Sequence, residues 1–188
     1  MRVLAPIVAL LIAMPLPAGA QNAAALDSNH TSANFAAKHL LISTVQGNIP
    51  VKSTSIVLGG DYVPSSVEAV MDLTKIDTHN DRRDNDLRSE RFLDVAQYPE
   101  MTFKSTKITP EGAGKFEMAG DLTICGITKP IVVNGTIGGS IKDKQGRTHV
   151  GYAATAVIDR RQWNVGTTIP AAIVSYEIDI TIEAEAIL

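Results

Sequence analysis

Four histidines, His30, His39, His79 and His149, are the residues of this chain best suited to metal binding or proton transfer. A zinc site needs at least three converging side-chain ligands, and compact motifs that supply them, such as His-Glu-x-x-His, are absent from the sequence. His30 and His39 are nine residues apart, so one straight strand would place them on opposite faces. We therefore expect the histidines to be structural or to contact the polar head of a ligand, and we predict no metal site.

A densely charged stretch, residues 77–96, holds the carboxylates and guanidinium groups that could bind an ion or a polar ligand. The run DND at residues 84–86 gathers oxygen ligands as a calcium loop does. An EF-hand loop also needs a glycine at its sixth position and a glutamate at its twelfth, and both are missing here. We expect the stretch to form a solvated cap held by arginine–carboxylate pairs. Alternatively, Arg83 and Arg88 point toward the polar head of a ligand.

Enzyme motifs are absent from the sequence, which has neither a Gly-x-Ser-x-Gly nucleophile elbow nor a glycine-rich phosphate loop. Cys125, the single cysteine, lies in an alternating stretch without a neighbouring base. We expect it to fill space in a sheet rather than to act as a nucleophile. The sequence therefore predicts a protein that is not an enzyme and that uses no cofactor.

Composition narrows the function classes further. The chain has 188 residues and a net charge of −3, which argues against nucleic-acid binding because that function usually requires a basic patch. Residues 1–20 combine Arg2, an apolar run of about twelve residues and an Ala-Gly-Ala end, the pattern of a signal peptide cleaved after Ala20. The run is shorter than the roughly 20 residues of a transmembrane helix. We expect residues 21–188 to form one periplasmic or secreted domain without stable membrane insertion.

Alternation between apolar and polar residues dominates the chain after the expected signal peptide. Such period-two patterns predict antiparallel strands with one buried face, and about eight of them separated by turn residues predict an all-β barrel or sandwich. Residues 77–96 are the exception, and Asn80 or Asp81 can cap a short helix there. The alternating runs are 31–38, 45–58, 65–75, 101–108, 115–126, 131–141, 150–159 and 174–185.

Several motifs, in order along the chain, resemble those of the YceI family of exported lipid-binding proteins. The most distinctive is GDLTICGITKPI at residues 120–131. An early segment, DSNHT at 27–31 followed by Phe35 and His39, is similar to the family's Asp-x-x-His-Ser pattern, with Thr31 in place of the serine. The rest of the chain is similar at IDT 76–78, RD 83–84, LRS 87–89, FLD 92–94, YP 98–99, Phe103, IDR 158–160 and Trp163.

The resemblance covers about residues 25–187 and implies a lipocalin-like, extended, eight-stranded antiparallel barrel whose interior holds a polyisoprenoid chain. The aromatic content of 5% agrees with an interior that keeps free volume. Two positions depart from the family pattern. Asp86 stands where the family usually has a histidine, which puts a headgroup or metal role there in doubt. Trp163 is bulkier than the usual phenylalanine and is expected to reshape one end of the interior.

Alternation and motif position together indicate the candidate binding residues. Apolar side chains are expected to form the wall of the interior and polar ones its mouth. The predicted wall comprises Phe35, Val67, Met71, Phe103, Phe116, Met118, Leu122, Ile124, Tyr152, Trp163, Tyr176 and Ile178. The predicted mouth comprises His30, His39, Arg83 and Arg160.

From these residues we predict a periplasmic or secreted carrier that sequesters a polyisoprenoid or similar long-chain amphiphile. Burying one methylene is worth roughly 0.8 kcal/mol, so a long chain needs few specific contacts. Two alternatives remain: an accessory enzyme or redox helper acting on a quinone-like isoprenoid, and a solid barrel that serves as a stress-related interaction protein. The sequence leaves the headgroup, the chain length, the delivery partner and a homodimer open.

Overall fold

The structure is a computed structural model that describes residues 22–188, and the expected signal peptide lies outside the described residues. Strands and turns make up most of the described chain, as the alternation predicts. The strands are β1 (Asn22–Leu26), β2 (Ser32–His39), β3 (Ser43–Asn48), β4 (Val51–Leu58), β5 (Pro64–Asp72), β6 (Glu100–Gly112), β7 (Lys115–Ile124), β8 (Ile127–Lys142), β9 (Thr148–Asp159) and β10 (Val174–Ile187). The helices are α1 (Asp81–Arg88) and the 3-10 turns Gly60–Tyr62, Leu73–Lys75 and Arg160–Trp163.

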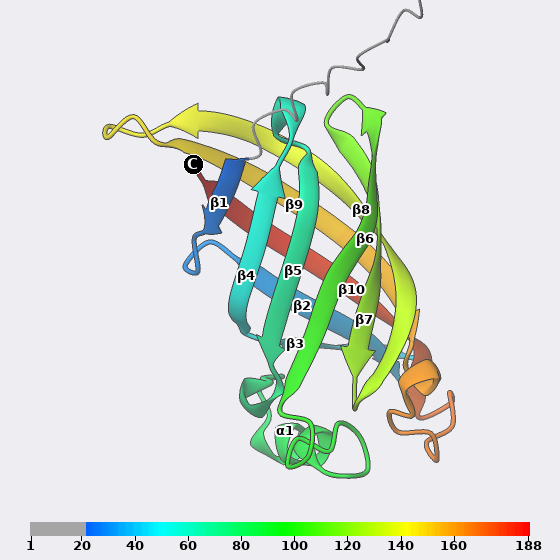
Figure 1. The fold of residues 1–188 in the computed structure, drawn as a ribbon. Coiled ribbons are helices and arrows are strands. Elements are labelled where there is room, and N and C mark those ends of the chain that lie inside the picture. Colours follow the sequence, from blue (N-terminus) through cyan, green and yellow to red (C-terminus); the bar gives the residue numbers. More distant parts are fainter. Residues whose placement is uncertain (1–21) are drawn as a thin grey trace, which may run out of the picture.

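Eight of these strands close into an antiparallel barrel (Figure 1). The ring runs from β1 through β4, β5, β6, β7, β8, β9 and β10, and β10 pairs with β1 again. The β2–β3 hairpin attaches to β10 beside this ring. The predicted eight-stranded barrel with a helical insert is therefore confirmed.

The short strand β1 closes the barrel. Ala25 pairs with Ile187 of β10, and Ala24 pairs with Ile56 of β4, so β1 is hydrogen-bonded on both edges. Alternation did not predict this strand, because its sequence NAAAL has no regular polar–apolar period. We call the part of the barrel around β1 the β1 end and the opposite part the α1 end (Figure 1).

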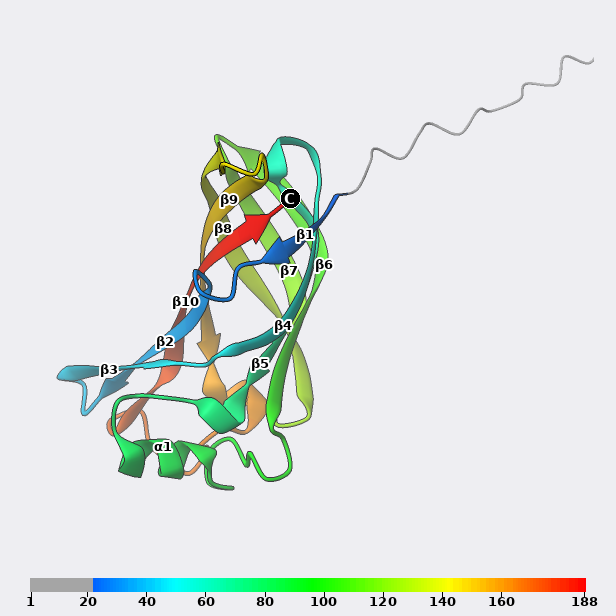
Figure 2. The same ribbon diagram turned by 90° about the vertical axis from the view of Figure 1, so that its left-hand side faces the viewer.

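Toward the α1 end the wall divides. After residues 27–31 the chain resumes as β2 along the same edge of β10, and β2 pairs with β3. Residues 45–58, expected as one strand, are split at Ile49-Pro50, since proline offers no N–H to a ladder. The hairpin consequently extends away from β4 and β5, above α1 (Figure 2).

The helix α1 is fixed at its N-terminus by capping. Asn80 is the N-cap, and its side-chain oxygen accepts a hydrogen bond from the Arg83 N–H at 3.0 Å. Asp84 is buried, and its Oδ1 accepts hydrogen bonds from the N–H and the hydroxyl of Thr78. The helix is thus held against the segment that leads into it. Among residues 22–188, no helix has the length and apolar character needed to cross a membrane.

The β1 end of the barrel is filled by side chains. The rings of Phe116 and Tyr152 meet edge to face with their centroids 6.5 Å apart, and both are buried. The Tyr152 hydroxyl donates to the Tyr62 carbonyl at 2.7 Å, and burial raises the pKa of Tyr152 to about 12. Leu58 and Val150 are fully buried beside them. This end of the barrel is therefore a solid core.

A histidine bridges two carboxylates on the outside of the same end. The His149 ring lies 2.6 Å from Glu185 Oε1 through Nδ1 and 3.0 Å from Asp143 Oδ2 through Nε2. Glu185 and Asp143 together raise the pKa of His149, because both hydrogen bonds favour the protonated imidazole. The contact with His149 in turn holds the pKa of Asp143 well below its usual range.

We expect His149→Gln to destabilise the fold in a pH-dependent way. A histidine whose pKa is raised by folding adds to the free energy of unfolding. This contribution is complete below the pKa of the unfolded chain, about 6.5, and is lost as the pH rises through the pKa of the folded protein. The difference in melting temperature between wild type and variant should therefore be larger near pH 5.5 than near pH 9. His39→Gln is the matched control, because no hydrogen bond of the His39 ring occurs among residues 22–188. An equal difference at both pH values would contradict the proposed charge bridge.

Candidate functional site

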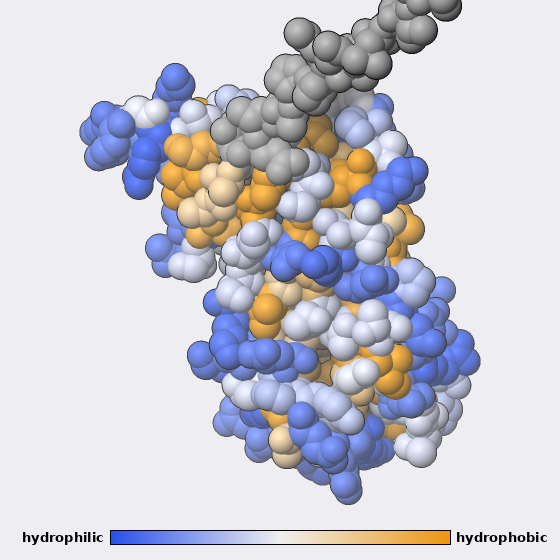
Figure 3. Space-filling view, viewed as in Figure 1, coloured by the Kyte–Doolittle hydropathy of each residue, from blue (hydrophilic) through white to orange (hydrophobic). Residues whose placement is uncertain are grey.

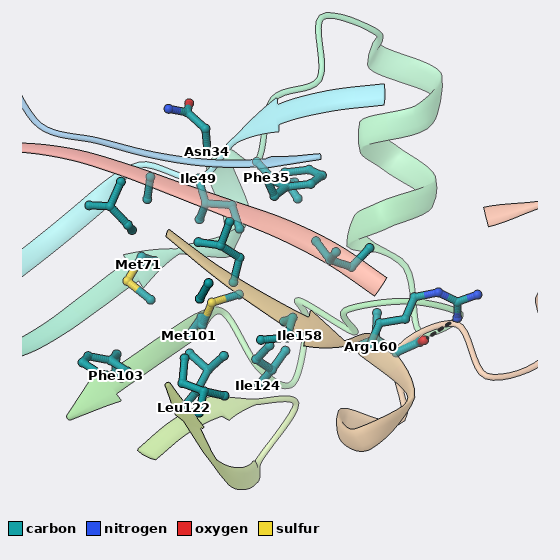
Figure 4. Close-up of a pocket in the computed structure, with 18 of the residues that line it drawn as sticks. Asn34, Phe35, Ile49, Met71, Met101, Phe103, Leu122, Ile124, Ile158 and Arg160 are labelled. Atoms are coloured by element: carbon teal, nitrogen blue, oxygen red, sulfur yellow. Dashed lines mark hydrogen bonds between the residues drawn. The ribbon is translucent and has the colours of Figure 1, made fainter. Parts of the chain in front are cut away.

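A cavity of about 270 Å³ occupies the middle of the barrel and its α1 end (Figure 4). Its wall is almost wholly apolar, since Asn34 and Arg160 are the two polar residues that line it in the described part of the chain. The Asn34 side chain bonds to Ser32 and Asn48 instead of presenting a free polar group to the cavity. The apolar lining residues include Phe35, Ile49, Met71, Met101, Phe103, Met118, Leu122, Ile124, Ile131, Val133, Ile158, Ile178, Ile180 and Ile182.

Glycines let two of the wall phenylalanines lie close to the backbone. Phe35 pairs with Gly47 on the neighbouring strand, and a Cβ at Gly47 would lie 2.4 Å from the Phe35 ring. A Cβ at Gly120 would likewise lie 2.4 Å from the Phe103 ring. Both distances are far below van der Waals contact, so each ring occupies the space of the missing side chain. The rings therefore take less of the cavity than their size suggests.

An open cleft of about 640 Å³, here called the vestibule, adjoins the cavity at the α1 end. It lies between the β2–β3 hairpin, residues 80–92 and residues 169–174. The cavity and the vestibule are neighbours, since both are lined by Phe35, Ala37, Leu87, Phe92 and Val174.

Positive charge dominates the vestibule, although the whole chain is acidic. Lys38, Arg82, Arg83 and Arg91 line it, and Asp86 is the one acidic residue among its described lining residues. The Arg91 guanidinium lies 3.7 Å from the Asp86 carboxylate, so one of the four cations is partly compensated. Figure 3 shows hydrophilic side chains dominating the surface around α1, in contrast to the apolar patches nearer β1. The arrangement is an apolar cavity beside a cationic cleft.

The sequence matches the YceI-like domain over residues 25–186, which is nearly the whole described chain. The chain belongs to the YceI family. A UPF0312 protein of Vibrio parahaemolyticus is 34% identical to it over 175 residues, covering 91% of this chain and 93% of that protein.

Solved structures of similar fold include a family member. The crystal structure of a Campylobacter jejuni YCEI protein has a TM-score of 0.72 and 33% identity, covering 80% of this chain and 89% of that one. A polyisoprenoid binding domain from Saccharophagus degradans has a TM-score of 0.61 over 89% of this chain and 98% of that domain. At 13% identity, this similarity shows the shared fold alone.

Seven of the predicted wall residues line the cavity in this YceI-family barrel, and five lie elsewhere. Alternation identifies the inward face of a strand but not the height along the barrel. Val67, Phe116 and Tyr152 therefore point inward, yet pack above the cavity in or beside the solid core at the β1 end. The seven lining residues are Phe35, Met71, Phe103, Met118, Leu122, Ile124 and Ile178.

Trp163 and Tyr176 are displaced by local backbone irregularities. Trp163 lies in the 3-10 turn after β9, fully buried, and its indole N–H donates to the Leu122 carbonyl at 3.0 Å. Tyr176 falls within the register shift between Val174 and Ile178, and its ring packs against the Arg161 guanidinium at 3.8 Å. Neither side chain lines the cavity, which corrects their predicted placement.

The four predicted mouth residues separate in space. His39 and Arg83 line the vestibule, whereas His30 lies at the β1 end, where its ring is 2.9 Å from Asp27. The placement of His30 at the mouth is therefore wrong. Arg83 is partly tethered, since it donates from Nε and Nη2 to the hydroxyl and the carbonyl of Thr78, each at 2.7 Å. Its Nη1 forms no hydrogen bond with residues 22–188.

Arg160 reaches the edge of the cavity, but its N–H groups are directed elsewhere (Figure 4). The side chain is 4% exposed, and burial lowers its pKa. Its guanidinium donates to several backbone carbonyls of the segment between the 3-10 turn and β10, so its role is to hold that segment rather than to contact a headgroup. The acceptors are the carbonyl oxygens of Val165, Gly166, Ile169, Val174 and Ser175.

The surroundings of Cys125 disfavour a reactive thiol. Cys125 lies at the tight turn after β7 rather than within a strand, with a φ of 48°, and its thiol is 3.3 Å from the Leu93 carbonyl. Burial raises the pKa of Cys125, which disfavours the reactive thiolate.

Asp27, His30 and Glu185 each bring one possible ligand atom within 4.8 Å of the others. Glu185 already pairs with His149 and Asp27 with His30, so these groups satisfy one another. The absence of a metal site stays a prediction.

Sequence reasoning missed part of the site. Ile131, Val133, Ile180 and Ile182 line the cavity, and the regular alternation within β8 and β10 carries the signal that would have identified them. The vestibule residues Arg82 and Arg91 carry no such signal, because their meeting with Lys38 depends on how α1 lies against a hairpin distant in sequence.

Arg160→Leu should lower the free energy of unfolding by about 3 kcal/mol, since the buried carbonyls that it satisfies would lose their donors. Urea denaturation followed by the fluorescence of the single tryptophan, Trp163, measures this change. Arg161→Leu is the matched control, because Arg161 forms a half-exposed pair with Asp159 that should contribute about 1 kcal/mol or less. Equal losses in the two variants would show that the carbonyl contacts of Arg160 are not stabilising.

Proposed function

We propose that this protein binds a long apolar chain, such as a polyisoprenoid, in the cavity, with the polar end of the ligand at the vestibule. The observation that carries the proposal is the apolar cavity that adjoins a cationic cleft. Such a cavity excludes water, since a buried water needs two or more polar partners and the wall offers none that is free. Binding then follows from the removal of apolar surface from water, at roughly 0.8 kcal/mol per methylene.

The character of the lining supports binding rather than catalysis. Arg160 is the one titratable side chain among the described lining residues of the cavity, and its donors are occupied by backbone carbonyls. An acid–base or redox step on a bound ligand would need an ionisable or redox-active group within reach of it. A role as a carrier requires only the cavity and its entrance.

Two further lines of support come from outside the cavity. The Saccharophagus degradans domain with the same fold is described as polyisoprenoid binding. Residues 1–20 have the pattern of a signal peptide, and we propose on that basis that the protein acts in the periplasm or outside the cell.

The direct test is to purify the protein under native conditions, extract it with organic solvent and identify the extracted lipid by mass spectrometry. We expect a long-chain isoprenoid or similar amphiphile in about equimolar amount, since one cavity holds one chain. Protein from several expression hosts that yields no lipid would overturn the proposal.

A variant that fills the cavity should lose its ligand while staying folded. Met118 lines the cavity and is buried, so Met118→Trp should reduce the bound lipid about tenfold or more, because the indole competes for the same space. The matched control is Val132→Trp on the adjacent strand, where the side chain is 47% exposed and faces away from the cavity. Lipid per protein and melting temperature are measured for both. Equal lipid content in the two variants would show that the ligand lies elsewhere.

A further inference from the structure

The tip of the β2–β3 hairpin exposes three large apolar side chains in a row. Leu40, Leu41 and Ile42 are 45%, 70% and 85% exposed. Ile173, itself 43% exposed, lies beside them, because its carbonyl accepts the Leu40 N–H at 3.0 Å. Single exposed apolar residues are common on soluble proteins, but a contiguous protruding group is a typical mark of an interaction site. We call these four residues the apolar tip.

The turn at the apolar tip is made by residues that do not favour it. The Ile42 N–H donates to the His39 carbonyl at 3.2 Å, and both central residues have positive φ, 52° at Leu40 and 61° at Leu41. Tight hairpin turns of this geometry favour asparagine and glycine, since a Cβ is unfavourable in the left-handed region. Here the strained positions hold leucines that remain exposed. Neither the local conformation nor the core explains why apolar residues stand there.

Cationic side chains flank the apolar tip. Lys38 precedes it on β2, and Arg82, Arg83 and Arg91 face the same hairpin across the vestibule. The combination of a protruding apolar group with flanking lysine and arginine matches the interface of an anionic bilayer, where apolar side chains enter the acyl region and cations contact phosphates. This positive charge is local, since the chain as a whole has a net charge of −3.

The shape of the apolar tip also favours a bilayer over a protein partner. The hairpin projects from the barrel wall (Figure 2), so its end offers a small convex surface. A stable protein interface buries about 800 Å² on each side and is usually well packed, which a projecting turn of this kind does not supply. Shallow insertion into a fluid lipid layer needs only a few side chains.

We propose that the apolar tip and its cationic neighbours dock the protein on the surface of an anionic phospholipid bilayer, with the vestibule facing the lipid. Docking in this orientation would let an apolar chain pass between the bilayer and the cavity without crossing water. That consequence rests on the proposed function, whereas docking itself does not. In this proposal the membrane contact is peripheral and is made through a turn.

The test is flotation of the purified protein with vesicles made of phosphatidylcholine and phosphatidylglycerol in equal parts, and with vesicles of phosphatidylcholine alone. Neither contains an isoprenoid, so the assay measures docking and not ligand capture. The wild type should float with the anionic vesicles and less with the neutral ones. Leu41→Asn combined with Ile42→Ser should weaken the association about tenfold or more.

Two further variants define which part of the surface acts. Ile141→Ser combined with Val157→Ser removes two residues of similar exposure, 71% and 59%, outside the apolar tip and should leave vesicle binding unchanged. Arg82→Gln combined with Arg91→Gln should reduce binding to anionic vesicles and leave binding to neutral ones unchanged.

The proposal is overturned if the wild type does not float with anionic vesicles, or if the tip variant and the Ile141/Val157 control bind equally. It is also overturned if the tip variant converts a dimer to a monomer by size-exclusion chromatography while still floating, which would assign the apolar tip to a second copy of the chain. Melting temperatures verify that each variant is folded. Lipid extracted from the wild type reports separately on the proposed function, so failure of docking and failure of ligand binding are distinguishable.

Discussion

The architecture depends on the strand β1, which closes the barrel at one end only. β1 bonds to β4 on one edge and to β10 on the other, but it ends at Leu26, and the chain that follows pairs with β3 in a separate hairpin. A full-length strand in this place would seal the wall along its whole height. Because β1 is short, the α1 end stays divided, and residues 80–92 and the hairpin become the sides of an entrance instead of parts of the sheet.

The two ends of the barrel therefore have different interiors. Phe116 and Tyr152 fill the β1 end, whereas residues of the middle strands leave the cavity below them free. The α1 end would otherwise expose a row of loop carbonyls to this apolar space. Arg160 satisfies those carbonyls from within, so one buried cation allows the wall of the cavity to remain apolar.

Much of the fold could be predicted from residue alternation, and the places where this prediction fails have physical reasons. The regular pattern of β7 and β10 identified Met118, Leu122 and Ile178 as wall residues, because period two specifies the face of a strand. Period two does not specify the position along the barrel axis, and for this reason it predicts Phe116 as a cavity residue although Phe116 packs in the core at the β1 end. The sequence predicts eight strands for the barrel, which is confirmed, but the predicted run 31–38 is β2, which lies beside the ring. The eighth strand of the ring is β1, whose sequence lacks a polar residue at every second position. The vestibule and the position of His30 depend on contacts between distant segments, which no local pattern encodes.

The pairing of phenylalanine rings with glycines gives the barrel a way to change its capacity in small steps. A methyl group added at position 47 would meet only side chains, the Phe35 ring and the Thr78 methyl group, which must give way. At position 120 it would also lie 2.7 Å from the Lys104 carbonyl oxygen, so the backbone there would have to shift. A single substitution at Gly47 can thus change the volume of the cavity beside Phe35, whereas one at Gly120 would also alter the wall itself. At position 47, the capacity of the barrel interior can therefore vary while the strands keep their places.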